Sequence, residues 1–287
     1  MKRASVQLKK VLERLYEKYN QHRLIKPDPL QFVYRYRRLR DMEIAGFLAS
    51  ALAYGRVQQI EKSVEGLLLK MGESPYEFVI NFNKARRKIL SSFRHRFTNG
   101  DDISDLLELF KEVLLEYGSI EKFFAHGYNK DDENIVNALT VFCGELYEMY
   151  FVRNNRQVSR GLKYLLAGPA GGSASKRLNL FLRWMVRKDD VDAGLWKSVN
   201  RAKLIVPIDV HMGRLCKIIG LYDGRSVSLS SALKITAGFA MIEPGDPAKY
   251  DFALSRIGIV EDCNGRYRQG CEMCELFDYC LKREQWL

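Results

Sequence analysis

A long stretch without proline constrains the fold of this chain more than any other feature. The chain has 287 residues but only 7 prolines, and none lies between Pro75 and Pro169. Because proline inside a helix removes a hydrogen bond and clashes with the preceding turn, nothing in this stretch interrupts a helix. Apolar residues recur there at helical spacing, from Ile103 to Tyr117 and from Ile135 to Tyr150, whereas the alternation typical of strands is scarce. The sequence therefore predicts an all-α protein.

Three further apolar stripes predict helices outside this stretch, and no repeat of fixed period is present. Their members are Val6, Val11, Leu12, Leu15 and Tyr16; Ile44, Phe47, Leu48, Ala51 and Leu52, behind an Asp41 cap; and Leu178, Phe181, Leu182, Met185 and Val186. We place boundaries near Asp41 and near Asp189. This division predicts an N-terminal helix in residues 1–40 that packs on the C-terminal lobe, a central helical lobe in 41–188, and a C-terminal lobe in 189–287.

The distribution of charge favours an anionic partner. The formal net charge is +11, and residues 153–217 alone contain 14 Lys or Arg against 4 Asp or Glu. Such a block indicates either a nucleic-acid footprint or an ordinary solvated basic face. No apolar run reaches the length of a membrane span, and the N-terminal residues lack a signal-peptide core. We therefore expect a cytoplasmic protein associated with the nucleoid.

The cysteine spacing near the C-terminus predicts a metal centre. Four cysteines follow the pattern Cys263-x7-Cys271-x2-Cys274-x5-Cys280. Thiolates at such spacings converge on one soft metal site, and the two-residue gap presents both of its sulfurs to the same side. We favour a [4Fe-4S] cluster, with zinc as the alternative, since zinc ribbons usually contain two short C-x2-C pairs. The other two cysteines, Cys143 and Cys216, lie in apolar surroundings and are predicted to be core thiols.

A glycine-rich turn, residues 168–173, separates two predicted helices. Its candidate phosphate-binding residues are Gly168, Gly171, Gly172 and Ser173, followed by Arg177. Backbone amides at a helix start, together with the positive end of the helix dipole, bind phosphate without help from side chains. Ser173 or Ser175 can cap the second helix. The alternative is a plain turn between helices.

Two ionisable residues after this turn are candidates for catalysis. Lys176 falls in the first helical turn, where the dipole and nearby cations weaken its hold on a proton, so its amine can become a nucleophile. Its alternative role is a phosphate contact. Asp209 follows Pro207 and begins another helix, where it serves as an N-cap. Its carboxylate can in addition stabilise the positive charge that develops when a glycosidic bond breaks, and can activate Lys176 or a water.

These motifs together resemble a known superfamily. The glycine-rich turn, Lys176, Asp209 and the four cysteines are similar in order to the helix-hairpin-helix DNA glycosylases, in the endonuclease III branch that carries an iron-sulfur loop. The chain, especially Gly172 to Trp196, is also similar to an uncharacterised bacterial and archaeal family that we place within this superfamily. The resemblance implies a two-lobed fold with a helix-hairpin-helix and a C-terminal four-cysteine cluster loop. It further implies an enzyme of base excision repair that flips a damaged base out of double-stranded DNA and cleaves its N-glycosidic bond, with or without lyase activity at the abasic site.

The resemblance also implies DNA contacts beyond the turn. Arg214, Arg266 and Arg268 would contact the phosphate backbone, and Tyr54 or Arg56 would be the wedge that fills the space left by the flipped base. The run from Phe93 to Phe97 interleaves aromatic and basic residues, and we interpret it as a half-buried segment. We expect a monomer. The alternative function is a non-catalytic, iron-sulfur nucleic-acid-binding or redox-responsive protein, and a third is a zinc-containing RNA-binding module.

Overall fold

The computed structural model describes residues 2–224, 226–259, 263, 266–267 and 269–280. These residues form α-helices, short 3₁₀ turns and one small hairpin, which confirms the all-α prediction. The α-helices are α1 (Lys2–Tyr19), α2 (Leu39–Ala51), α3 (Val57–Met71), α4 (Pro75–Ile80), α5 (Lys84–Leu90), α6 (Gly100–Glu116), α7 (Ile120–His126), α8 (Val136–Asn154), α9 (Arg160–Leu165), α10 (Lys176–Val186), α11 (Val210–Ile218), α12 (Leu229–Ala240) and α13 (Asp251–Ile259).

The remaining regular elements are short. The 3₁₀ turns are η1 (His22–Leu24), η2 (Pro29–Arg35), η3 (Pro169–Gly171), η4 (Arg201–Lys203), η5 (Cys271–Met273) and η6 (Phe277–Tyr279). The strands β1 (Arg94–His95) and β2 (Thr98–Asn99) pair antiparallel.

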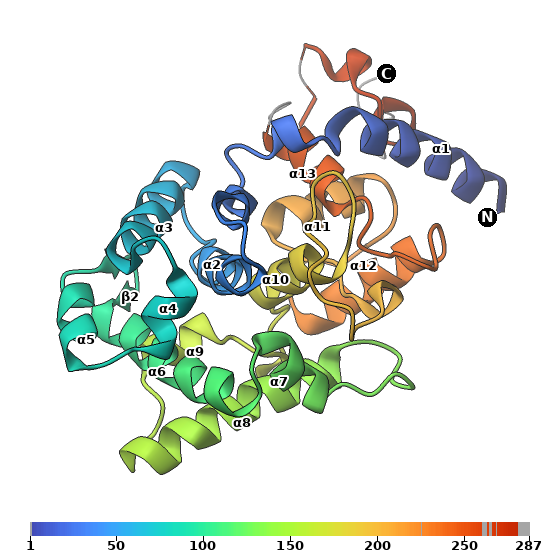
Figure 1. The fold of residues 1–287 in the computed structure, drawn as a ribbon. Helices are drawn as coiled ribbons and strands as arrows, with labels where there is room; N and C mark the ends of the chain where they lie inside the picture. Colours follow the sequence, from blue (N-terminus) through green and yellow to red (C-terminus); the bar gives the residue numbers. More distant parts are fainter. Residues whose placement is uncertain (1, 225, 260–262, 264–265, 268, 281–287) are drawn as a thin grey trace.

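Helices α2 and α10 pack against each other at the centre of the molecule (Figure 1). Nearly every residue of α2 is buried, because α10 covers one side and η2 another. Gly46 shows how close the contact is, since a Cβ there would lie 2.9 Å from Met185 Cε and 3.2 Å from Val33 Cγ2. The packing of α2 therefore fixes the position of α10, the helix that begins with Lys176.

The two ends of the described chain meet on one side of the molecule. Helix α1 lies against α13 and beside the C-terminal segment that holds η5 and η6 (Figure 1). An ion pair of 2.9 Å between Lys18 and Glu275 joins them at the surface. The buried apolar residues form one connected core that extends from Leu8 to Leu276. Cys143 and Cys216 belong to this core, as predicted.

Helix α2 begins earlier than the sequence predicted. Arg38, not Asp41, is its N-cap, and Asp41 lies inside its first turn with 3% exposure. The Asp41 carboxylate instead accepts hydrogen bonds from Ser74 Oγ (2.6 Å) and Tyr76 N (3.0 Å) at the start of α4. The Asp41 cap prediction was therefore wrong, because this carboxylate caps a helix distant in the sequence.

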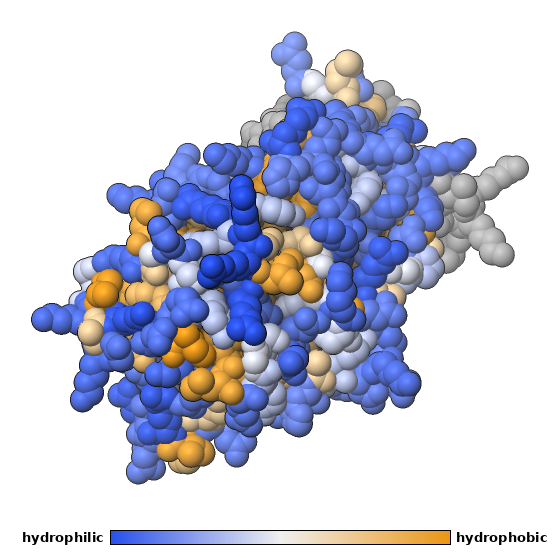
Figure 2. All heavy atoms as spheres, viewed as in Figure 1, coloured by the Kyte–Doolittle hydropathy of each residue, from blue (hydrophilic) through white to orange (hydrophobic). Residues whose placement is uncertain are grey.

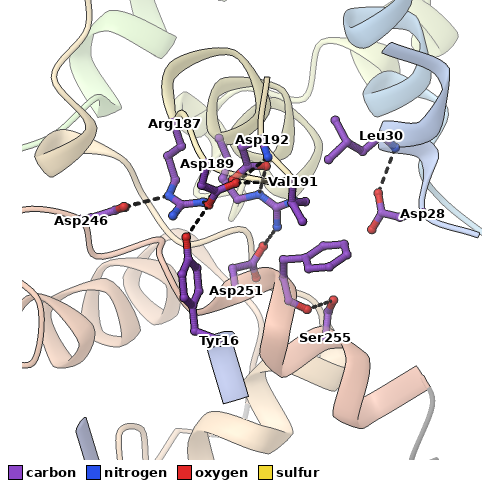
Figure 3. A network of polar contacts seen from close by, with 12 residues as sticks. Tyr16, Asp28, Leu30, Arg187, Asp189, Val191, Asp192, Asp246, Asp251 and Ser255 are labelled. Carbon is purple, nitrogen blue, oxygen red and sulfur yellow. Dashed lines mark hydrogen bonds and ion pairs between the residues drawn. The ribbon is translucent and has the colours of Figure 1, made fainter. Parts of the chain in front are cut away.

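A buried network of ion pairs joins α10 to elements from both ends of the chain (Figure 3). Arg187 donates from Nε to Asp246 (2.9 Å), and its Nη1 pairs with Asp189 (2.9 Å) and with Asp192. Tyr16 of α1 donates to Asp189 at 2.9 Å. This network holds the end of α10 against α1 and the turn before α13.

Arg183, one turn earlier on α10, extends the same network. Its Nε lies 3.2 Å from an oxygen of Asp192, and its Nη1 donates to Asp251 of α13. Arg183 and Arg187 are each 2% exposed. The basic block predicted at 153–217 is thus partly internal, because these two guanidinium groups neutralise buried carboxylates rather than face solvent.

The visible surface carries little continuous apolar area. Figure 2 shows a mostly hydrophilic face with hydrophobic residues in small separate areas. Within the described ranges, no helix is both long enough and apolar enough to span a membrane.

Candidate functional site

A cleft of about 650 Å³ lies where α10 and α11 begin. Its wall includes Tyr54 and Gly55 in the segment between α2 and α3, residues 27–29 before and within η2, and α13 with Asp251. Lys176 and Asp209 both line this cleft. Its volume lies within the range of ligand-binding pockets.

Lys176 and Asp209 form an ion pair in the cleft, although 32 residues separate them in the sequence. Lys176 Nζ donates to Asp209 Oδ2 at 2.8 Å, and the side chains are 33% and 35% exposed. Asp209 Oδ1 accepts the backbone N–H groups of His211 and Met212, each at 2.9 Å. Asp209 is therefore the N-cap of α11, as predicted, and its carboxylate is fixed by three donors.

The surroundings keep Asp209 ionised. Burial alone would raise the pKa of its carboxyl group, but Lys176, the Met212 amide and His211 together hold this pKa below the ordinary value. Asp251, deeper in the wall, is affected in the opposite way, since burial raises its pKa despite the pairing with Arg183. The cleft thus presents one reliably charged carboxylate beside an ammonium group.

The glycine-rich turn lies directly before α10 and meets the cleft through Ser173. Gly171 and Gly172 are exposed, and Gly172 adopts a left-handed conformation with φ of 75° that favours glycine. Gly168 is half-buried and packs closely on Cys143, since a Cβ on residue 168 would lie 2.8 Å from Cys143 Sγ. The turn is therefore exposed at Gly171 and Gly172, but the Gly172 N–H donates to the carbonyl oxygen of Pro169 at 2.8 Å and its carbonyl oxygen accepts the Leu229 N–H at 2.9 Å.

The capping of α10 differs from the predicted arrangement. Ser175 is the N-cap with φ of 47°, but its side chain makes no capping hydrogen bond. Ser173 Oγ instead accepts the N–H of Ser175 at 3.1 Å. No side chain therefore caps the first amides of α10.

Arg177 is engaged inside the protein, in contrast to the phosphate contact expected of it. Its guanidinium group donates to the carbonyl oxygens of Ala51 (2.6 Å) and Tyr164. The group also lies against two aromatic rings that contact each other, 5.0 Å from the centre of Tyr54 and 4.3 Å from that of Tyr164. Arg177 thus joins α10, the end of α2 and α9, which corrects the expectation of a free phosphate ligand.

The two residues expected to act as a wedge, Tyr54 and Arg56, differ in exposure and in their contacts. Tyr54 is half-buried, and its hydroxyl lies 2.8 Å from the carbonyl oxygen of His95 and 2.7 Å from Thr98 Oγ1. Arg56 is exposed and is the N-cap of α3. Tyr54 therefore supports the β1–β2 hairpin, and its hydroxyl is not available as an inserted wedge.

The other expected DNA contacts are scattered. Arg214 is half-buried on α11, and Arg266 is exposed near the cysteines. Arg268 lies outside the described residues.

The four C-terminal cysteines are half-buried, lie near one another and form no disulfide bond among the described residues. Burial raises the pKa of Cys274, and the charges of Cys263, Cys271 and Cys280 raise this pKa further. These three side chains are therefore close enough to Cys274 to interact with its sulfur electrostatically. In the part of the chain that the structure describes, no three His, Cys, Asp or Glu side chains are arranged closely enough to hold a metal ion. The donor set of four thiols suits a thiolate-bound cluster in its chemistry.

Sequence reasoning missed several residues of the cleft wall. Asp251, Arg183 and Arg256 line the cleft from inside, and Arg256 pairs with Asp28 at 3.1 Å. No local motif marks these residues, because each pair joins segments far apart in the sequence. The Phe93–Phe97 run could have indicated this region from the sequence, since its second half forms an exposed hairpin tip beside the cleft.

Comparison with known proteins identifies a family without an assigned activity. The model of the family described as protein of unknown function (DUF2400) matches residues 28–260. No curated protein and no solved structure is significantly similar to the chain. The family is not one of the helix-hairpin-helix glycosylase families, so the superfamily assignment made from the motifs was wrong. Because the match covers most of its length, the chain belongs to the DUF2400 family of proteins of unknown function.

Proposed function

We propose that this protein cleaves the N-glycosidic bond of a damaged base in double-stranded DNA, as a step of base excision repair. The Lys176–Asp209 pair in the cleft is the observation that carries the proposal.

Asp209 supplies the negative charge that this reaction needs. As the bond between C1′ and the base breaks, the base leaves with the electron pair and positive charge develops on the sugar. The carboxylate is held ionised and rigid by Lys176 and two backbone amides, so it can stabilise that charge without reorganising.

Lys176 can complete the reaction in either of two ways. If a water attacks C1′, Asp209 accepts the proton of the water and Lys176 remains an ammonium group. If Lys176 attacks, its proton passes to Asp209 over the 2.8 Å hydrogen bond, and the amine displaces the base from C1′. The departing base takes that proton from Asp209, and the C1′–O4′ bond then breaks as the amine passes a proton to O4′, which leaves a protonated imine between Lys176 and the opened sugar. Elimination from this imine would then break the strand.

The surroundings of the cleft suit a nucleotide that is rotated out of the duplex. The exposed turn at Gly171 and Gly172 precedes α10, and the first amides of α10, which the Ser175 side chain does not cap, can bind phosphate at the cleft. The arrangement we propose is two helical lobes with the cleft between them and α9 and α10 as the DNA-binding hairpin. A [4Fe-4S] cluster on the four cysteines would fix the C-terminal segment in place, with zinc as the alternative. We further propose that the protein acts as a monomer on DNA in the cytoplasm.

A panel of duplexes with oxidised, deaminated or alkylated bases tests the proposal. Release of at least one of these bases by the purified protein is expected, and no release from any of them would contradict the proposal. Borohydride trapping then separates the two routes. A covalent protein–DNA complex that Lys176→Gln abolishes would identify the amine as the nucleophile, and release without trapping would identify water.

A second candidate function is a non-catalytic nucleic-acid-binding protein that responds to oxidation. The four half-buried cysteines favour it, because sulfurs that lie near one another can be oxidised together. Salt-dependent DNA affinity that changes on oxidation, with no base release, would support this alternative.

A further inference from the structure

The tip of the β1–β2 hairpin exposes an aromatic side chain and a guanidinium group. Phe97 is 66% exposed, and Arg96 beside it is also exposed. Arg96 has a φ of 51°, a left-handed conformation that residues other than glycine rarely adopt. Among the described residues Arg96 has no ion-pair partner, and its guanidinium carbon lies over one face of the Phe97 ring, 5.4 Å from the ring centre.

The base of the hairpin is rigid, so the tip cannot easily withdraw from solvent. His95 is fully buried, and its ring nitrogens lie 2.8 Å from Ser63 Oγ and 3.1 Å from the carbonyl oxygen of Tyr54. The Tyr54 hydroxyl contacts both strands, at His95 and Thr98. The exposure of Phe97 is therefore imposed by buried hydrogen bonds below it.

The tip lies beside the cleft that holds Lys176 and Asp209. The Arg96 side chain covers Gly55, a residue of the cleft wall, so closely that a Cβ there would lie 2.8 Å from Arg96 Cδ. The centre of the Phe97 ring is 5.7 Å from that of Tyr164, which packs on Arg177 next to the catalytic lysine candidate. A nucleic acid over the cleft would therefore meet this tip.

We propose that Phe97 is a stacking platform for an unpaired nucleobase at the edge of the cleft, and that Arg96 contacts the adjoining phosphate. The inference rests on the proposed function for the position of the DNA. An aromatic face accepts any base, and a guanidinium group beside it binds the phosphodiester that follows. A single exposed ring next to a cation suits this ligand better than a protein partner, which would need a wider apolar area.

The test compares the affinity of the full-length protein for two duplexes, one with a single unpaired base and one fully paired. Phe97→Ala should weaken binding of the first by about 5-fold to 150-fold, the range measured for loss of one base–aromatic stack, and should change the second little. Phe97→Tyr should retain the preference. Phe151→Ala is the matched control, since Phe151 is 46% exposed on α8 and does not line the cleft.

Three results would overturn the inference: equal effects of Phe97→Ala and Phe151→Ala, an equal loss on both duplexes, or no DNA binding by the wild-type protein. Arg96→Gln provides an independent measurement, because it should lower the slope of log affinity against log salt by about 1 while Phe97→Ala leaves it unchanged. Base release is not part of this assay. Phe97-dependent binding by a protein that releases no base would therefore refute the proposed function alone.

Discussion

Asp192→Asn should lower the free energy of unfolding by about 3–5 kcal/mol, the cost of removing one partner from a buried ion pair. Asp192 is fully buried and accepts hydrogen bonds from both Arg183 and Arg187. An asparagine of the same shape keeps the volume but leaves two buried guanidinium groups with one fewer negative charge.

Urea denaturation followed by circular dichroism measures this loss, and thermal unfolding should show a fall in Tm of about 6–20 °C for a domain of this size. Asp190→Asn is the control in the same loop, because Asp190 is exposed and its Oδ2 accepts only the His22 N–H (2.8 Å) among the described residues. The control should lose about 1 kcal/mol or less. A loss below about 1 kcal/mol for Asp192→Asn, or one equal to that of the control, would refute the argument that this network anchors α10.

Three other predictions concern separate parts of the structure. Burial lowers the pKa of His95, so below pH 6.5 the unfolded chain takes up a proton that the folded protein does not; the stability of the wild type relative to His95→Gln should therefore fall as the pH falls, by up to about 1.4 kcal/mol per unit, and a difference independent of pH in urea titrations would contradict this. Arg177→Lys should cost about 1–3 kcal/mol in the same assay, because a lysine lacks the planar fork that bonds both carbonyl oxygens while it packs on the two tyrosine rings; an unchanged midpoint would contradict this. Cys274→Ser should abolish bound iron and sulfide in protein purified without oxygen, whereas Cys143→Ala should not; equal metal content in both variants would exclude the proposed cluster.

Local patterns predicted the helices and one cap correctly. Asp209 begins α11 because a carboxylate before an apolar helical stripe caps the first amides, and that signal lies within four residues. The stripes around Phe47 and Phe181 likewise became the buried faces of α2 and α10.

Contacts between distant segments could not be predicted in this way. Asp41 resembles an N-cap of its own helix, yet it accepts hydrogen bonds from Ser74 and Tyr76. Counting charges treats every arginine as a surface cation, whereas Arg183 meets a carboxylate 68 residues away and is buried with it. The glycine-rich turn, the lysine and the aspartate suggested a superfamily to which the chain does not belong, since capping and phosphate-binding elements recur in unrelated folds.

The central claim is that Asp209, paired with Lys176, breaks the bond between a damaged base and its sugar. The most direct test is the single-turnover rate of base release by wild-type protein and by Asp209→Asn on the best substrate of the panel. We predict that the variant remains folded and is slower by roughly 10²- to 10⁴-fold, since it loses a charge that acts at the reacting carbon. Equal rates for the two proteins would contradict the account.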